Sequence, residues 1–230
     1  MSRYHSYINS AREILCTYKG ETPFSSFLKK SFSSNKKFGS RDRKTISHLC
    51  YCYFRLGRSA VSLTIDERIL ISLFVCSNNS NEILAALKPE WNEQVGLSLE
   101  KKLVIINYSS LITEIFPWRN ELTNRIDHEK FCESFLIQPD VFIRLRPGKE
   151  KGVIEKLKKE KFDFEIILEN CLAVPSASKL DDIIELDIEA VIQDVNSQRT
   201  GDFIKSEIRN QRSEIRSQEA FACRQLISDF

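Results

Sequence analysis

A run of positive side chains between residues 29 and 44 is the first feature that could do chemistry. The stretch KKSFSSNKKFGSRDRK has seven lysines and arginines and one aspartate, a local net charge of +6 in a chain whose total is +2. The rest of the chain therefore carries −4, so positive charge is concentrated in one place. Such side chains bind the phosphates of nucleic acids, with an affinity that falls as salt rises. The residues are Lys29, Lys30, Lys36, Lys37, Arg41, Arg43 and Lys44.

Two aromatic residues, Phe32 and Phe38, lie among these charges. An exposed aromatic ring can stack on an unpaired base, which would add recognition to the phosphate contacts. Two alternatives stay open: Lys29 and Lys30 are the solvated face of a helix, and both phenylalanines belong to the core. The density of charge around a loop between helices favours a nucleic-acid partner.

A second candidate surface lies in the segment VFIRLRP, where apolar and polar side chains alternate. This alternation predicts a strand whose outward face carries Phe142, Arg144 and Arg146. Guanidinium groups beside an aromatic ring suit RNA, because arginine bridges phosphates and stacks on bases. The alternative is that the arginines pair with carboxylates such as Glu150 and Glu165.

Motifs that perform catalysis are missing from the sequence. No two glycines lie within three residues of each other, so there is no glycine-rich loop for a nucleotide or an adenosyl cofactor. No GxSxG, HExxH or P-loop motif occurs. The seven cysteines contain no CxxC pair and the three histidines are far apart, so we expect free thiols and no metal site. We therefore predict no catalytic residue and no metal ligand in this chain.

The elements that position these residues follow from hydrophobic periodicity. Apolar residues three and four apart predict a helical first part of the chain, with Pro23 opening the second helix and Ser40 capping the third. The inward face of the third helix is expected to hold Ile46, Leu49, Cys50, Tyr53 and Phe54, and Gly57 ends it. The predicted helices span residues 6–18, 24–32, 40–55, 66–76, 81–87 and 99–105.

The pattern changes near residue 138. A helix over 128–137 precedes the alternating strand, and an amphipathic helix over 149–161 and further strands near 164–168, 171–174 and 190–193 follow. We therefore predict a mainly α chain with a small α/β domain containing a mixed sheet. The expected domains are a helical domain over 1–127, the α/β domain over 128–195, and a polar C-terminal helical segment over 196–230.

Three stretches resemble the N-terminal region of the Sun/Fmu-type RNA cytosine-5 methyltransferases of the NOL/NOP/Sun family. In GSRDRKTISHLCYCYFRLG, the family's Asp-Arg pair, Leu-Cys pair and final arginine are matched by Asp42, Arg43, Leu49, Cys50 and Arg55. FLIQPDVFIRLRPGKE resembles the strand that enters the family's small pre-catalytic domain. VIQDVNSQ resembles the family's QDxxSQ signature at the threshold of the methyltransferase domain, matched at Gln193, Asp194, Ser197 and Gln198.

The resemblance implies a fold and a function. The helical domain looks like that of the antitermination factor NusB, which binds RNA, and the implied activity is rRNA processing by a transferase that uses S-adenosyl-L-methionine. The family's glycine-rich cofactor loop and its Pro-Cys and Thr-Cys cysteines come later in the chain and are not matched here. We therefore expect no cofactor and no methyltransferase activity in this chain alone, and a natural protein that continues beyond it; a free-standing adaptor is the alternative.

Composition and charge limit the remaining possibilities. Hydrophobic residues make up 42% and charged residues 29%, as in globular proteins, and no apolar run approaches the ~20 residues that cross a bilayer. The polar N-terminus lacks the apolar core of a signal peptide. We expect a cytoplasmic protein with RNA as its partner and no membrane contact, and the resemblance implies that this RNA is ribosomal. A protein partner bound through the helical domain or the C-terminal helix is the competing interpretation.

Overall fold

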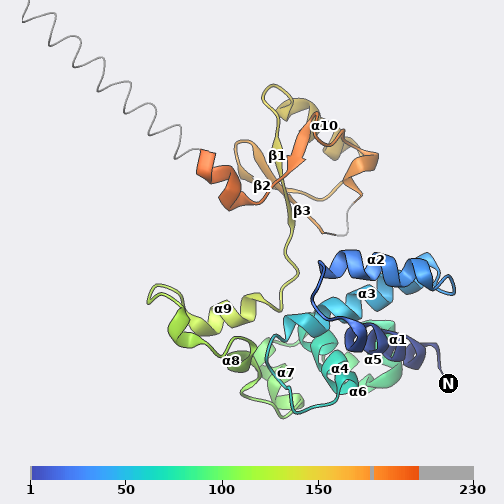
Figure 1. Cartoon of the computed structure of the whole chain (residues 1–230). Helices are drawn as coiled ribbons and strands as arrows, with labels where there is room; N and C mark the ends of the chain where they lie inside the picture. The colour runs from blue at the N-terminus through green and yellow to red at the C-terminus, as the bar shows by residue number, and fades with distance from the viewer. Residues whose placement is uncertain (1, 177–178, 202–230) are drawn as a thin grey trace, which may run out of the picture. The chain divides into compact units, whose positions relative to one another are not determined.

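The structure, a computed structural model, describes residues 2–176 and 179–201, and the chain divides into two compact units. The first unit is helical and the second contains a four-stranded sheet, which confirms a mainly α chain with a small β-containing part (Figure 1). The division falls after Gln138, whereas the sequence placed it after residue 127, because Cys132 and Leu136 belong to the core of the helical unit. Most of the predicted C-terminal segment, 202–230, lies outside the described residues.

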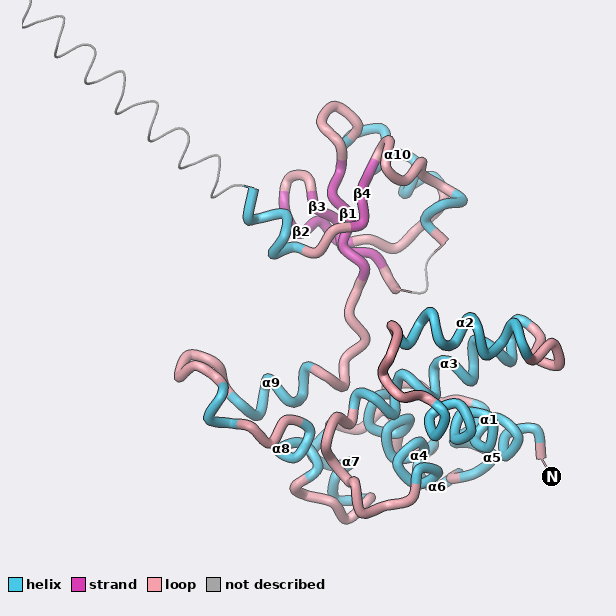
Figure 2. The backbone as a smooth tube through the Cα atoms, in the orientation of Figure 1, coloured by secondary structure: helices cyan, strands magenta, loops and turns pink. Residues whose placement is uncertain are grey.

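The helical unit is built on α3 and α4, and α3 packs against both α1 and α4. Helix α4 is buried on most of its circumference, with Ile69, Leu73 and Phe74 at most 2% exposed. Figure 2 shows the helices of this unit and their connecting loops. They are α1 (Arg3–Thr17), α2 (Phe24–Ser34), α3 (Ser40–Arg55), α4 (Ile65–Cys76), α5 (Glu82–Leu87), α6 (Pro89–Asn92), α7 (Leu99–Ile105), α8 (Leu111–Ile115), the short 3-10 turn η1 (Arg119–Glu121) and α9 (His128–Ser134).

The start of α3 differs from the sequence prediction. Gly39, and not Ser40, is the residue before the first helical turn, and the Gly39 N–H donates to the Asp42 carboxylate at 3.0 Å. A carboxylate in the first turn also complements the partial positive charge of a helix N-terminus. Ser40 therefore sits inside the helix, and Asp42 takes the role expected of a capping side chain.

The inward face of α3 also differs from the prediction, since Cys52 is buried and Tyr53 is only half-buried. Ile46, Leu49, Cys50 and Cys52 are fully buried, whereas Phe54 remains 40% exposed. The Phe54 ring packs against α2, with its centroid 4.7 Å from that of Phe24. Phe54 thus belongs to an aromatic cluster at the edge of the bundle, because it lies on the side of α3 that faces α2.

Gly57 closes α3 against α8. It has a positive φ of +50°, and a Cβ at this position would lie 2.3 Å from the Ile115 carbonyl oxygen. That same oxygen accepts a hydrogen bond from the Arg58 N–H at 3.0 Å. The predicted end of the helix at Gly57 is confirmed, and the close approach explains why no side chain fits there.

The second unit contains a sheet in the order β2-β3-β1-β4, and every neighbouring pair of strands is antiparallel. The predicted mixed sheet is therefore wrong: β3 lies between β1 and β2, so the two strands joined through α10 are not neighbours. The inner face packs against α10 with Ile143, Leu145 and Leu172 at most 1% exposed. The elements are β1 (Val141–Leu145), α10 (Glu150–Lys159), β2 (Glu165–Leu168), β3 (Cys171–Val174), the 3-10 turn η2 (Leu180–Asp182) and β4 (Ala190–Ile192), followed by helical residues 195–201.

Candidate nucleic-acid interface

The seven predicted cations of the helical unit all lie at the surface, on α2, on the loop that follows it and on the first turns of α3. Among the described residues only one of them, Arg41, forms an ion pair, with Glu82 of α5 at 2.7 Å. Both partners are more than 60% exposed, and an exposed pair of this kind stabilises a fold by at most about 1 kcal/mol. We call the seven residues the basic surface; they are Lys29, Lys30, Lys36, Lys37, Arg41, Arg43 and Lys44.

Asp42 lies within the basic surface and is held by three hydrogen bonds. Its carboxylate accepts hydrogen bonds from the Tyr7 hydroxyl at 2.5 Å, from the Gly39 N–H at 3.0 Å and from Arg3 at 3.2 Å. The pKa of Asp42 is lowered first by the Tyr7 hydrogen bond and then by that of Gly39. Arg43 is fixed in turn, because its Nε donates to the Phe38 carbonyl at 2.9 Å. The sequence did not single out Arg3 or Tyr7, since the pairing joins α1 to α3 across 35 or more residues.

The two phenylalanines of this region serve the core. Phe32 is 6% exposed, and half-buried Phe38 meets it edge to face with 5.8 Å between ring centroids. The structure therefore supports the interpretation of Phe32 as a core residue and places Phe38 at the edge of the core. The Lys37 ammonium lies 4.9 Å from the Phe38 ring centroid, within the range of a cation–π contact.

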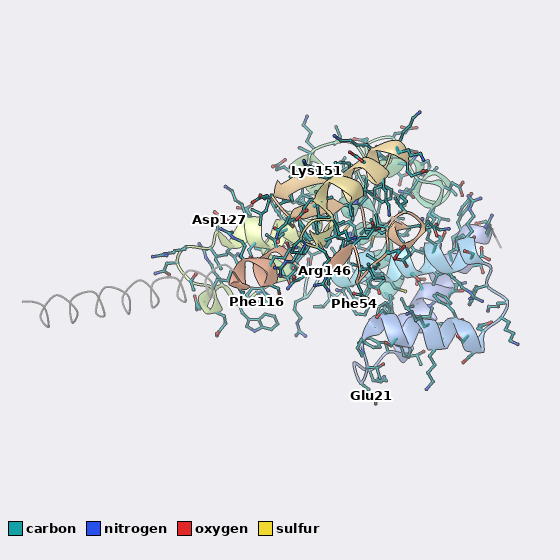
Figure 3. The ribbon with its side chains drawn as sticks, turned by 90° about the horizontal axis from the view of Figure 1, so that it is seen from above. Glu21, Phe54, Phe116, Asp127, Arg146 and Lys151 are labelled. Atoms are coloured by element: carbon teal, nitrogen blue, oxygen red, sulfur yellow. The ribbon has the colours of Figure 1, made fainter. Side chains whose placement is uncertain are left out.

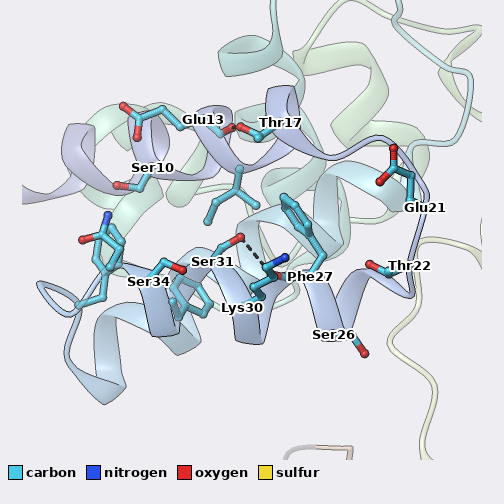
Figure 4. Close-up of a pocket in the computed structure, with 14 residues that line it drawn as sticks. Ser10, Glu13, Thr17, Glu21, Thr22, Ser26, Phe27, Lys30, Ser31 and Ser34 are labelled. Atoms are coloured by element: carbon cyan, nitrogen blue, oxygen red, sulfur yellow. Dashed lines mark hydrogen bonds between the residues drawn. The ribbon is translucent and has the colours of Figure 1, made fainter.

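A cavity of about 560 Å³ lies between α1 and α2, next to the basic surface (Figure 4). Ser31 donates to the Phe27 carbonyl at 3.0 Å along its α2 wall. Its lining carries the cation Lys30 together with the carboxylates of Glu13 and Glu21. Charges of both signs make this cavity a poor site for a phosphate.

The second predicted surface is on the outer face of the sheet and at its β4 edge. Arg144 is half-buried and Arg146 exposed, and neither forms an ion pair with Glu150, Glu165 or any other described residue. Both arginines line a groove of about 470 Å³ together with Gln193 (Figure 3 labels Arg146). The structure thus brings the arginine face and the first signature residue together, although they are almost 50 residues apart in the chain.

The QDxxSQ residues form a helix start. Asp194 precedes helical residues 195–201 and accepts a hydrogen bond from the Ser197 N–H at 2.9 Å. The Gln198 side chain is 6% exposed and donates to the Gln193 carbonyl at 2.8 Å. Burial raises the pKa of the Cys171 thiol, and a hydrogen bond with Gln198 partly offsets this rise. These contacts hold the helical turn against β3 and β4, which is an architectural role.

The thiols and the remaining groups show no catalytic arrangement in the described part of the chain. The six cysteines described there are free, and no group of three or more metal-ligating side chains occurs among residues 2–176 and 179–201. Burial raises the pKa of Cys50 to about 12. The pKa of Cys76 is instead lowered, first by its hydrogen bond with Cys52 and, among charged groups, chiefly by Arg55.

Within the same described ranges, every helix is too short or too polar to span a bilayer. Comparisons with known proteins returned no match: no family model fits the chain, and no curated protein and no solved structure is similar to it.

Proposed function

We propose that this chain is the RNA-docking N-terminal region of an S-adenosylmethionine-dependent ribosomal RNA cytosine-5 methyltransferase, without the domain that transfers the methyl group. In this proposal the helical unit is NusB-like and binds RNA, and the sheet-containing unit positions the RNA for a catalytic domain. The observation that carries the proposal is the basic surface, where six of seven cations make no ion pair among the described residues. Cations that are not neutralised by a carboxylate are available to phosphates.

The resemblance supplies the second line of support. Its three stretches contain the whole of α3, the strand β1, and the helix start after β4. Arg144, Arg146 and Gln193 line one groove, so two of these stretches meet on one surface of the sheet-containing unit. A basic surface and a groove with two unpaired arginines fit a partner with a phosphate backbone better than an acidic or apolar partner.

The test is binding of ribosomal RNA fragments to the full chain across a salt series, measured by fluorescence anisotropy. One variant changes Lys36, Lys37, Arg41 and Arg43 to Glu, and the matched control changes four exposed lysines outside the basic surface to Glu. Both take the formal net charge from +2 to −6, so they differ only in the position of the change. The control residues are Lys19, Lys101, Lys130 and Lys151.

Phosphate contacts predict that wild-type affinity falls steeply between ~50 and ~200 mM salt. The basic-surface variant should lose binding and the control should retain most of it. If the basic-surface variant binds as well as the control variant and both retain most of the wild-type affinity, the RNA site lies instead at Arg144 and Arg146. Absence of salt-sensitive binding by the wild-type chain would reject RNA docking. The proposal also expects no transfer of a labelled methyl group to RNA by this chain, and detectable transfer would contradict it.

A protein-interaction module is the second candidate, and three exposed apolar side chains in the last part of the helical unit, from Trp118 to Ile137, favour it. Trp118 is 50% exposed, Ile126 45% and Ile137 67%. Large exposed apolar side chains are common in protein interfaces, where they gather into one patch. Binding through such a surface would change little with salt, so the same titration distinguishes the two functions.

A further inference from the structure

A cavity of about 360 Å³ opens beside the first turns of α3, at one end of the basic surface. Its volume falls within the roughly 300–1,000 Å³ of small-molecule sites in proteins. Helices α1, α3, α4 and α5 contribute to its walls, so the cavity is a product of the tertiary fold. The side chains used in the argument below are Tyr4, Tyr7, Arg41, Lys44, His48 and Glu82.

The walls offer a flat aromatic surface. Tyr4 is half-buried, and Tyr7 meets it at an interplanar angle of 70° with ring centroids 6.5 Å apart. Tyr7 is therefore edge-on to Tyr4 and does not stack on it in parallel. An aromatic ring of this kind can receive a planar base by stacking.

The rim supplies charge and hydrogen bonds. Arg41 and Lys44 belong both to the cavity lining and to the basic surface, and Arg41 is held in place by Glu82. The pKa of His48 is lowered, first by desolvation and then by Arg55 and Lys44. The His48 ring belongs to the same cavity lining, and its Nε2 lies 3.6 Å from the sulfur of the Cys52 thiol.

We infer that this cavity receives an unpaired base of the RNA whose phosphates lie on the basic surface. The inference rests on the proposed RNA docking and adds that the RNA must present a base that is not stacked in a helix. A fully paired duplex keeps its bases stacked, so it reaches the lysines and arginines but not Tyr4. The preferred ligand is thus a single strand, a loop or a bulge.

The test compares three RNAs on the full chain at ~50 and ~200 mM salt: a mixed-sequence single strand of twelve nucleotides, the same strand with abasic sugars, and its fully paired duplex. The variant is Tyr4→Ala. Tyr4→Phe keeps the ring and serves as rescue, and Tyr51→Ala removes an exposed tyrosine that does not line the cavity. Thermal melting of each variant establishes that it is folded.

Wild type should bind the intact strand roughly tenfold or more tighter than the abasic strand, since stacking one base on an aromatic ring contributes about that much. Tyr4→Ala should reduce this difference to about twofold, whereas Tyr4→Phe and Tyr51→Ala should retain it. Salt-sensitive binding of intact and abasic strands with equal affinity, or retained discrimination in Tyr4→Ala, would overturn the base site and leave RNA docking in place. Loss of salt-sensitive binding to all three RNAs in wild type would overturn both.

Discussion

Replacing Gly57 with alanine tests how α3, which carries three of the seven residues of the basic surface, is fixed in the helical unit. The residue has a φ of +50°, which costs an alanine about 1–2 kcal/mol. The added Cβ would also lie 2.3 Å from the Ile115 carbonyl oxygen and 3.1 Å from its carbon. Because these are backbone atoms of another helix, they cannot rotate away, and overpacking of this kind costs about 1–3 kcal/mol. The expected loss in the free energy of unfolding is therefore about 2–5 kcal/mol.

Gly20 provides the matched control within the same unit. Its φ is +82°, but a Cβ there meets no atom within 4 Å, so Gly20→Ala carries the conformational cost alone. Thermal unfolding followed by circular dichroism measures both variants. At about 4 °C per kcal/mol for a unit of this size, Gly57→Ala should lower the Tm by roughly 8–20 °C and Gly20→Ala by roughly 4–8 °C. Equal Tm values for the two variants would refute the close approach to Ile115.

Three further outcomes are expected. The pKa of Cys76 is lowered and that of Cys50 is raised to about 12, so iodoacetamide at pH 7.5 should alkylate Cys76 faster than Cys50. Peptide mass spectrometry measures the two rates, and equal rates would contradict the prediction. The Tyr7 hydrogen bond lowers the pKa of Asp42 from 3.8, so its stabilisation is present above about pH 4 and is lost below it. The decline in Tm of wild type between pH 4 and pH 2 should therefore be steeper than that of Asp42→Asn, and parallel declines would exclude this role. Gln198→Ala removes a hydrogen bond that contributes about 1 kcal/mol, so amide exchange in β3 should rise about fivefold, whereas unchanged exchange would show that the turn does not hold the sheet.

Elements with a regular hydrophobic period were predictable from the sequence. The end expected for α3 and both bounds expected for α7 match the structure, since apolar residues three and four apart mark the face that packs on the core. The alternation in β1 likewise predicted Ile143 and Leu145 as inward residues, and both are at most 1% exposed. The hydrophobic period of a segment indicates which of its faces is buried, whichever element covers that face.

Features that depend on the identity of the partner could not be predicted. The pair of Arg41 with Glu82 joins α3 to α5, and nothing within either helix indicates it. The sheet was expected to be mixed because β1, α10 and β2 follow one another, as they do in parallel βαβ units. In the structure β3 lies between β1 and β2. The hydrophobic period of each strand does not indicate which strands pair. The cavity beside Tyr4 is built from four helices, so its aromatic and basic walls meet only in the folded unit.

The residues that carry the family resemblance and the residues that carry the proposed function have different roles. Asp42 and Asp194 each accept hydrogen bonds at the start of a helix, which any protein with these helices could use whatever it binds. Lys36 and Lys37 form no ion pair in the described part of the chain, so stability alone does not account for them. Loss of folding after substitution of Asp42 would therefore test only its structural role. Loss of RNA affinity at unchanged Tm after charge reversal of Lys36 and Lys37 would test the proposed function.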